Sequence, residues 1–141
     1  MGNWVLWLVT IELLGVAGLP FAAVLFRSLP DRGYGLSKPL GILLVGFLNF
    51  WLGSVGGFAN QPALLWLLAL GIFAAGGFML LPDLPELLAK RRSLFTLVAI
   101  EEAVFLAAFA GWTWVRLTNP DIFSTEKPMD YMLLQVSGMT H

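Results

Sequence analysis

The chain has 141 residues, of which 58% are apolar and only 12% are charged, so its composition does not describe a soluble surface and predicts an integral membrane protein. A net charge of −1, with eight scattered Lys and Arg residues, argues against a nucleic-acid partner, because binding phosphates requires a concentrated basic face. With no cysteine and a single terminal histidine, the sequence also excludes a disulfide framework and a metal site built from cysteine thiolates or clustered histidines.

The first apolar run, at about 4–26, is long enough to cross the ~30 Å of a membrane as a helix rising ~1.5 Å per residue. Trp4 and Trp7 are suited to anchor one end at the interface, and Arg27 follows the other end. Pro20 lies inside the run and is expected to kink or loosen the helix. A cleaved signal peptide is the alternative, but no basic segment precedes the run and its length exceeds that of a usual signal-peptide core.

Three further apolar runs are also long enough to span the membrane. The first two of them carry several glycines, which let helices in lipid approach each other closely. A very short turn joins these two runs and predicts an antiparallel hairpin. The four predicted spans lie at about 4–26, 40–58, 63–81 and 94–115.

The segments between the spans differ in character. Residues 27–39 are rich in turn formers and predict a loop, whereas residues 82–92 predict a loop or a short interfacial helix ending in three consecutive cations. The expected fold is therefore all-α: an integral membrane four-helix bundle over residues 1–116, followed by an extracytoplasmic loop or short helix over residues 117–141.

The distribution of Lys and Arg predicts the orientation in a plasma membrane. The first and third connections carry six cations, whereas the N-terminus and the second connection carry none. Because short cytoplasmic loops are enriched in Lys and Arg, the first and third connections are expected in the cytoplasm, with the N-terminus and the C-terminal segment outside. The six cations are Arg27, Arg32, Lys38, Lys90, Arg91 and Arg92.

Three glutamates and one asparagine lie within the predicted spans. An ionised Glu12, Glu101 or Glu102 would cost at least ~2.5 kcal/mol there, so each is expected to be neutral, paired or turned to the bundle interior. They are either hydrogen-bonded packing contacts between the first and fourth helices or part of a proton path. No basic residue lies within the predicted spans to pair with them, which weakens the second interpretation. Asn49 adds a polar contact in the second span.

The stretch from Arg116 to Tyr131 gathers charge immediately after the last span. Asn119-Pro120-Asp121 predicts a turn that stops the fourth helix at the membrane surface. Glu126 and Asp130 then place two carboxylates around Lys127. Carboxylates there could hold a divalent metal, act as a general base toward an acceptor hydroxyl, or simply complement the dipole of a new helix.

Three stretches resemble the N-terminal part of the YYY membrane protein family, large multi-spanning proteins of mostly unassigned function. Family members are much longer, and an Asp-Pro-Trp region and a tyrosine triplet follow the third stretch; both are missing here, so the chain is expected to be an N-terminal fragment or a truncated member. The stretches are Asp31–Gly41, the segment from Glu101 and Glu102 to Phe105, and Arg116-x-x-Asn119-Pro120-Asp121 followed by Glu126–Asp130.

This resemblance implies an organisation similar to C-type glycosyltransferases, which take a sugar from a polyprenyl-phosphate donor and carry an acidic residue on an outer loop. Under that analogy Asp130 or Glu126 would act as base or as ligand of a divalent metal, and Lys127 or Arg116 would contact the donor phosphate. The chain alone is expected to be inactive.

The sequence is compatible with three functions. The first is the N-terminal part of a membrane glycosyltransferase that uses a lipid-linked sugar, completed by downstream polypeptide. The second is a non-catalytic subunit or scaffold whose glycines pack against partner helices in the bilayer. The third is a small proton-coupled transporter that uses Glu12, Glu101 and Glu102.

Overall fold

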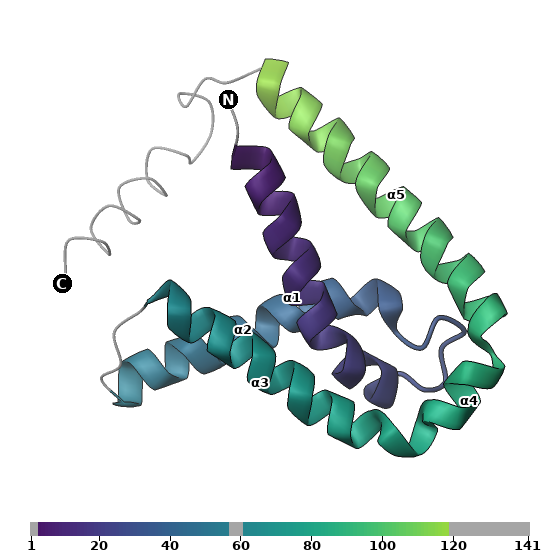
Figure 1. Ribbon diagram of the computed structural model, residues 1–141. Helices are drawn as coiled ribbons and strands as arrows, with labels where there is room; N and C mark the ends of the chain where they lie inside the picture. Colours follow the sequence, from purple (N-terminus) through teal and green to yellow (C-terminus); the bar gives the residue numbers. More distant parts are fainter. Residues whose placement is uncertain (1–2, 57–60, 119–141) are drawn as a thin grey trace. The chain divides into compact units, whose positions relative to one another are not determined.

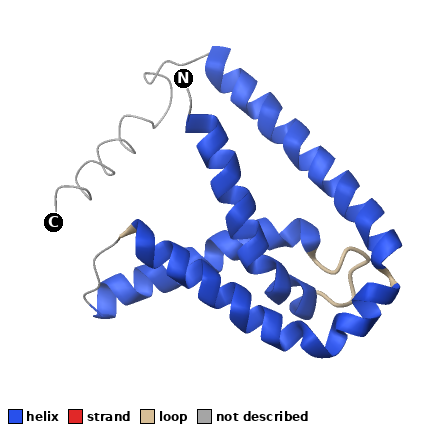
Figure 2. Cartoon of the chain, in the orientation of Figure 1, coloured by secondary structure: helices blue, strands red, loops and turns tan. Residues whose placement is uncertain are grey.

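The structure is a computed structural model that describes residues 3–56 and 61–118, and every element within these ranges is a helix (Figures 1 and 2). Four of the helices have the length and apolar composition of a membrane span, which confirms the all-α membrane fold predicted from the sequence. The long helices are α1 (Asn3–Leu25), α2 (Tyr34–Gly56), α3 (Pro62–Leu80) and α5 (Arg91–Thr118); a 3-10 helix, η1 (Leu81–Asp83), and the short α4 (Leu84–Ala89) connect α3 to α5.

The second helix begins earlier than the predicted residue 40. Arg32 and Gly33 have positive φ angles of 54° and 78°, which turn the chain sharply just before Tyr34. The carboxylate of Asp31 then accepts a hydrogen bond of 3.1 Å from the amide of Gly35 and so caps the new helix. The turn formers after Tyr34 are therefore helical, and Pro39 lies inside α2 instead of ending a loop.

Small residues bring α1 close to α2. A Cβ atom added to Gly41 of α2 would overlap the carbonyl oxygen of Leu14, and one added to Gly18 would lie 2.6 Å from the backbone nitrogen of Gly41. The two backbones are therefore in direct contact, as expected of glycine-rich helices in lipid. This contact fixes where the second helix can run along the first.

The first helix also packs against α3. Gly76 lies where a Cβ atom would come within 3.0 Å of Pro20, and the ring of Phe21 lies at the same point. The hydrophobic cluster at the centre joins all three helices and consists of Ala17, Val45, Ala69 and Ile72. Helix α1 is thus the element against which both α2 and α3 pack.

The first and third connections are held together by ion pairs. Arg27 Nε lies 2.8 Å from Asp83 Oδ2, and the guanidinium of Arg32 reaches both Asp83, at 3.5 Å, and Glu86, at 2.5 Å. These contacts place the short helix α4 beside the turn between α1 and α2. The short interfacial helix, one of the two alternatives for residues 82–92, is therefore present as η1 and α4.

Helix α5 has no buried residue along its length. The chain divides into two compact units, residues 1–105 and 106–141, so the beginning of α5 belongs with α1 to α4. The described part of the second unit is the remainder of α5, up to Thr118, and it exposes the large side chains of Trp112 and Trp114.

Candidate functional site

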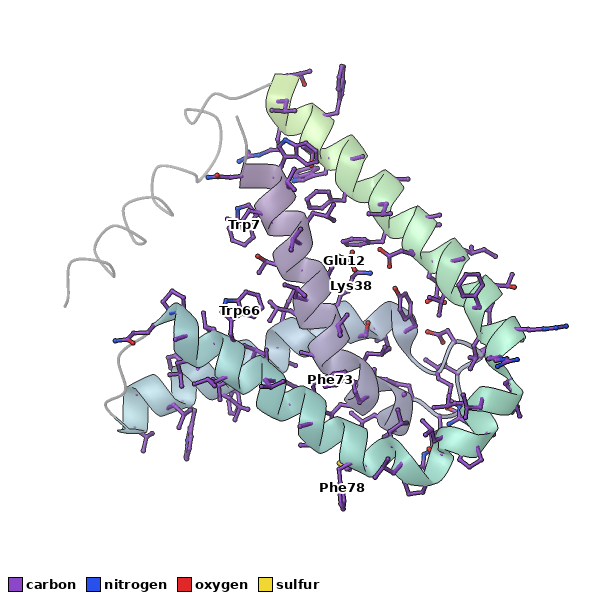
Figure 3. The ribbon with its side chains drawn as sticks, viewed as in Figure 1. Trp7, Glu12, Lys38, Trp66, Phe73 and Phe78 are labelled. Carbon is purple, nitrogen blue, oxygen red and sulfur yellow. The ribbon has the colours of Figure 1, made fainter. Side chains whose placement is uncertain are left out.

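Lys38 is the centre of a charged cluster built by three helices that are long and apolar enough to span a membrane. Its Nζ atom lies 2.5 Å from Glu102 Oε2 of α5 and 3.3 Å from Glu12 Oε2 of α1. The phenol of Tyr34, one turn earlier on α2, donates a hydrogen bond of 2.7 Å to the same oxygen of Glu102. Figure 3 shows Glu12 and Lys38 next to each other. We call Glu12, Tyr34, Lys38 and Glu102 the charged cluster.

The prediction that no basic residue lies in a span was wrong. Because α2 starts at Tyr34, Lys38 lies on the helix and not in the preceding loop, and its side chain is only 11% exposed. Glu102 is observed in the paired state predicted for it, and Glu12 lies 3.3 Å from the same ammonium. The expected contact between the first and fourth spans is made through a lysine of the second span.

Aromatic rings surround the ammonium of Lys38. Its Nζ atom lies 4.3 Å from the centre of the Phe105 ring and 5.2 Å from the centre of the Tyr34 ring. At these distances the negative face of a ring attracts a cation, and the attraction is stronger where water is excluded. The rings and carboxylates together replace the water that Lys38 loses.

Glu101 lies apart from the charged cluster, near the start of α2. A Cβ atom added to Gly35 would come within 3.3 Å of Glu101 Oε2, an oxygen that is buried without a hydrogen-bond partner. Adjacent helical positions are ~100° apart, so Glu101 and Glu102 approach different parts of α2. Asn49 lies about three turns beyond Lys38 on α2, at the other end of the helix from these glutamates.

A small cavity of about 20 Å³ adjoins the charged cluster. Its polar walls come from Glu12 on α1 and from Tyr34, Ser37 and Lys38 on α2. One water molecule needs roughly 10–15 Å³ and two or more polar partners, so the cavity has the size and lining for a single water. It is too small for a sugar or a lipid headgroup.

A larger groove of about 310 Å³ lies between α1 and α3 and opens toward the outside of the helices. Its walls are almost entirely apolar, with Trp66 and Phe73 on α3, both labelled in Figure 3, facing Ala17 on α1. Such a groove fits a hydrocarbon chain or the side chains of another helix. It offers no group that could perform chemistry.

The residues predicted to carry catalysis lie mostly outside the described ranges. Asp130, Glu126 and Lys127 fall there, so their roles as base, metal ligand and phosphate contact stay predictions. Arg116 is described, and it is exposed in the last turn of α5. Within residues 3–56 and 61–118, no three His, Cys, Asp or Glu side chains are arranged to hold a metal ion.

Sequence reasoning missed the roles of Lys38, Tyr34 and Arg32. Tyr34 and Lys38 are four positions apart, a spacing that would have placed both on one helix face had the segment been read as helical. Arg32 gave no such signal, because its partners Asp83 and Glu86 are distant in sequence.

Comparison with known proteins identifies one family. The family described as "Uncharacterized membrane protein (DUF2298)" matches residues 44–139, more than half of the chain. The match includes Glu102 and Arg116 and begins after Lys38. No curated protein and no solved structure matches the chain.

Proposed function

From the premise that the chain belongs to the DUF2298 family of uncharacterized membrane proteins, we propose that it is the N-terminal membrane module of a larger enzyme that transfers a sugar from a polyprenyl-phosphate donor. In this proposal the module holds the acidic segment after α5 at the outer membrane surface. Asp130 or Glu126 serves there as general base or as ligand of a divalent metal, and Lys127 or Arg116 contacts the donor phosphate. The resemblance to the YYY membrane proteins supports this assignment.

The observation that carries the proposal is the pairing of Arg27 and Arg32 with Asp83 and Glu86. These pairs favour placing the first and third connections on one side of the membrane, which the clustering of cations predicts to be the cytoplasm. Helix α5 starts beside them, and its 28 residues rise ~42 Å, more than the ~30 Å of the hydrocarbon core. The acidic segment would then lie outside, where lipid-linked sugars are used by the enzymes that the chain resembles.

The geometry of the charged cluster supports a catalytic site elsewhere in the protein. Lys38 is already occupied by Glu12 and Glu102, and the adjacent cavity has room for about one water. A sugar phosphate cannot reach these groups. Among the site residues predicted from the sequence, the remaining candidates for catalysis and donor binding are Arg116 at the end of α5 and the charged residues that follow this helix.

Transfer of a labelled sugar from a polyprenyl-phosphate donor, measured in vesicles that contain the full-length natural protein, tests the proposal. Asp130→Asn should lower the rate by at least about 100-fold, the usual minimum contribution of a general base. Asp121→Asn changes a neighbouring acid of the predicted turn that is given no part in catalysis or binding; it is the matched control and should retain transfer. If a metal is held there, a chelator should abolish transfer in the unaltered protein. No transfer by that protein, or full transfer after both Asp130→Asn and Glu126→Gln, would contradict the proposal.

A non-catalytic scaffold is the second candidate, and the surface of α5 favours it. The helix buries no residue, and several of its large apolar side chains are exposed, among them Phe95, Val104 and Val115. These side chains are available to pack against partner helices. Purification in mild detergent distinguishes the two functions: a scaffold would retain a second membrane protein and show no sugar transfer.

The proton-coupled transporter finds less support. The sequence argued against a transporter because no cation was predicted beside the glutamates, but in the structure Lys38 is such a cation. A transporter also needs a continuous polar path, whereas the polar cavity found at the charged cluster is the size of about one water. The cluster is therefore better suited to hold helices together than to conduct.

A further inference from the structure

The charged cluster contains two carboxylates but one ammonium. Glu12 and Glu102 both direct an oxygen at Lys38 Nζ, and Tyr34 adds a neutral phenol. Helix α3, which packs against α1 and α2, has no ionisable side chain. If both carboxylates were ionised, one uncompensated negative charge would lie within the membrane-spanning helices, at a cost of several kcal/mol.

The two carboxylates do not have equal partners. Glu102 Oε2 receives the ammonium of Lys38 at 2.5 Å and the phenol of Tyr34 at 2.7 Å, two donors that stabilise a negative charge. Glu12 Oε2 is 3.3 Å from the same ammonium, and Glu12 Oε1 is buried with no hydrogen-bond partner. The excess proton is therefore best placed on Glu12.

The small cavity adjoins the carboxyl group of Glu12. Glu12, Ser37, Lys38 and Tyr34 provide its polar lining, and its volume of about 20 Å³ accommodates one water. A water there would have the Ser37 hydroxyl and the Glu12 carboxyl as partners. It would link Glu12 to proton exchange while the side chains of Lys38 and Glu102 stay in place.

We propose that Glu12 is an intramembrane proton-binding site, held by Lys38 and Glu102 and served by the adjacent water-sized cavity. A hydronium ion of the solvent transfers its proton to a carboxylate oxygen of Glu12, which gains an O–H bond, and a neutral water molecule is left. Lys38 remains an ammonium and Glu102 a carboxylate, so the net charge of the cluster changes from −1 to 0. This site requires no sugar transfer and is independent of the proposed function.

Two other acids lie beside Gly35 in the first turn of α2, next to Tyr34 of the charged cluster. Glu101, the neighbour of Glu102 on α5, has a buried oxygen without a hydrogen-bond partner, and Asp31 in the first connection interacts with it electrostatically. Asp31 also accepts a hydrogen bond from the amide of Gly35. Any test must therefore separate Glu12 from Glu101.

Infrared difference spectroscopy of the full-length protein in liposomes distinguishes a protonated Glu12 from a protonated Glu101. At neutral pH we expect the carbonyl band of a protonated carboxyl group, shifted in D₂O because the cavity water exchanges. Glu12→Gln should remove this band, whereas the matched variant Glu101→Gln should keep it. Absence of the band from the unaltered protein, or loss of the band in Glu101→Gln but not in Glu12→Gln, would overturn the proposal.

A stability comparison guards against variants that fold poorly. Glutamine has the shape and neutrality of a protonated glutamic acid, so Glu12→Gln should unfold at nearly the same denaturant concentration as the unaltered protein. Glu102→Gln should unfold more easily, because it removes the carboxylate that neutralises Lys38. Equal losses in the two variants would mean that Glu12 is ionised, and the proposal would fail.

Discussion

The ammonium of Lys38 lies 2.5 Å from Oε2 of Glu102, although 64 positions separate the two residues in the sequence. This pair joins α2 to the first part of α5, a helix that buries no residue of its own. The phenol of Tyr34 and the ring of Phe105 complete the contact. A polar cluster thus anchors an element that hydrophobic packing alone does not hold.

Removing the ammonium should be the most damaging single change in the charged cluster. Lys38→Met would leave Glu102 and Glu12 without their cation, and breaking a buried ion pair from one side costs about 3–5 kcal/mol. The free energy of unfolding, measured by titrating the protein from mild detergent into SDS, should fall by that amount. Lys90→Met is the matched control, because Lys90 pairs with Glu86 at an exposed site where water screens the pair and little stability should be lost. Equal losses would contradict a buried role for Lys38.

The spans could be predicted because their signal is local. An apolar run can be recognised as a span from its length alone, because that length must match the thickness of a membrane. All four predicted spans are present as helices, with ends shifted by a few residues. The start of α2 was the main error. Pro39 and the glycines around Tyr34 suggest a loop in sequence, whereas the turn is set by the positive φ angles of Arg32 and Gly33, and Gly33 packs closely against Phe26, a contact that the sequence does not reveal.

The charged cluster could not be predicted for a different reason. Glu12, Lys38 and Glu102 come from three helices, and nothing in their sequence spacing shows that they meet. The polarity of Glu12 and Glu102 was recognised, and so was the requirement that they be paired. Their partner, Lys38, was assigned to the loop before the second span, whereas in the structure it lies on α2.

Gly41→Ala should separate α1 from α2. A methyl group at this position would overlap the backbone of Leu14, so the helices must shift, and overpacking of this kind costs about 1–3 kcal/mol. Gly46→Ala on the same helix has nothing within 4 Å of the new methyl group and should be neutral or slightly stabilising. The same detergent titration compares the two variants. If Gly46→Ala were as harmful as Gly41→Ala, close backbone contact would not be the reason.

Arg32 should matter more than Arg27, although both pair with Asp83. The side chain of Arg32 is 9% exposed and that of Arg27 is 54% exposed, so the first pair is screened much less by water. A hydrogen bond to Glu86 raises the pKa of the Arg32 guanidinium, which therefore stays charged. Arg32→Gln should lower the free energy of unfolding by about 1.5–3 kcal/mol, and Arg27→Gln by about 0–1 kcal/mol. The reverse order would argue against the observed pairing.

Single cysteines test the orientation, and the absence of native cysteine makes the experiment simple. Ser37 is unsuitable as a probe of the first connection because it is only 2% exposed on α2. Ser28 and Ser93 are exposed beside the ion-paired connections and replace it. In intact cells an impermeant thiol reagent should leave Ser28→Cys and Ser93→Cys unlabelled and should label Ser124→Cys, beyond the described residues. After the cells are opened, all three should react, which shows that each cysteine is reachable.

The opposite pattern would place the cations outside and the acidic segment in the cytoplasm. Because Arg27 and Arg32 are bound to Asp83 and Glu86, the first and third connections should always label alike. Labelling of Ser28→Cys without Ser93→Cys would therefore contradict the ion pairs themselves. Labelling of Ser28→Cys and Ser93→Cys without labelling of Ser124→Cys would be compatible with the fold but would show that its orientation in the membrane is the reverse of the predicted one. In that case Asp130 could not act on a sugar carried in the outer leaflet, and the glycosyltransferase proposal would lose its geometric support.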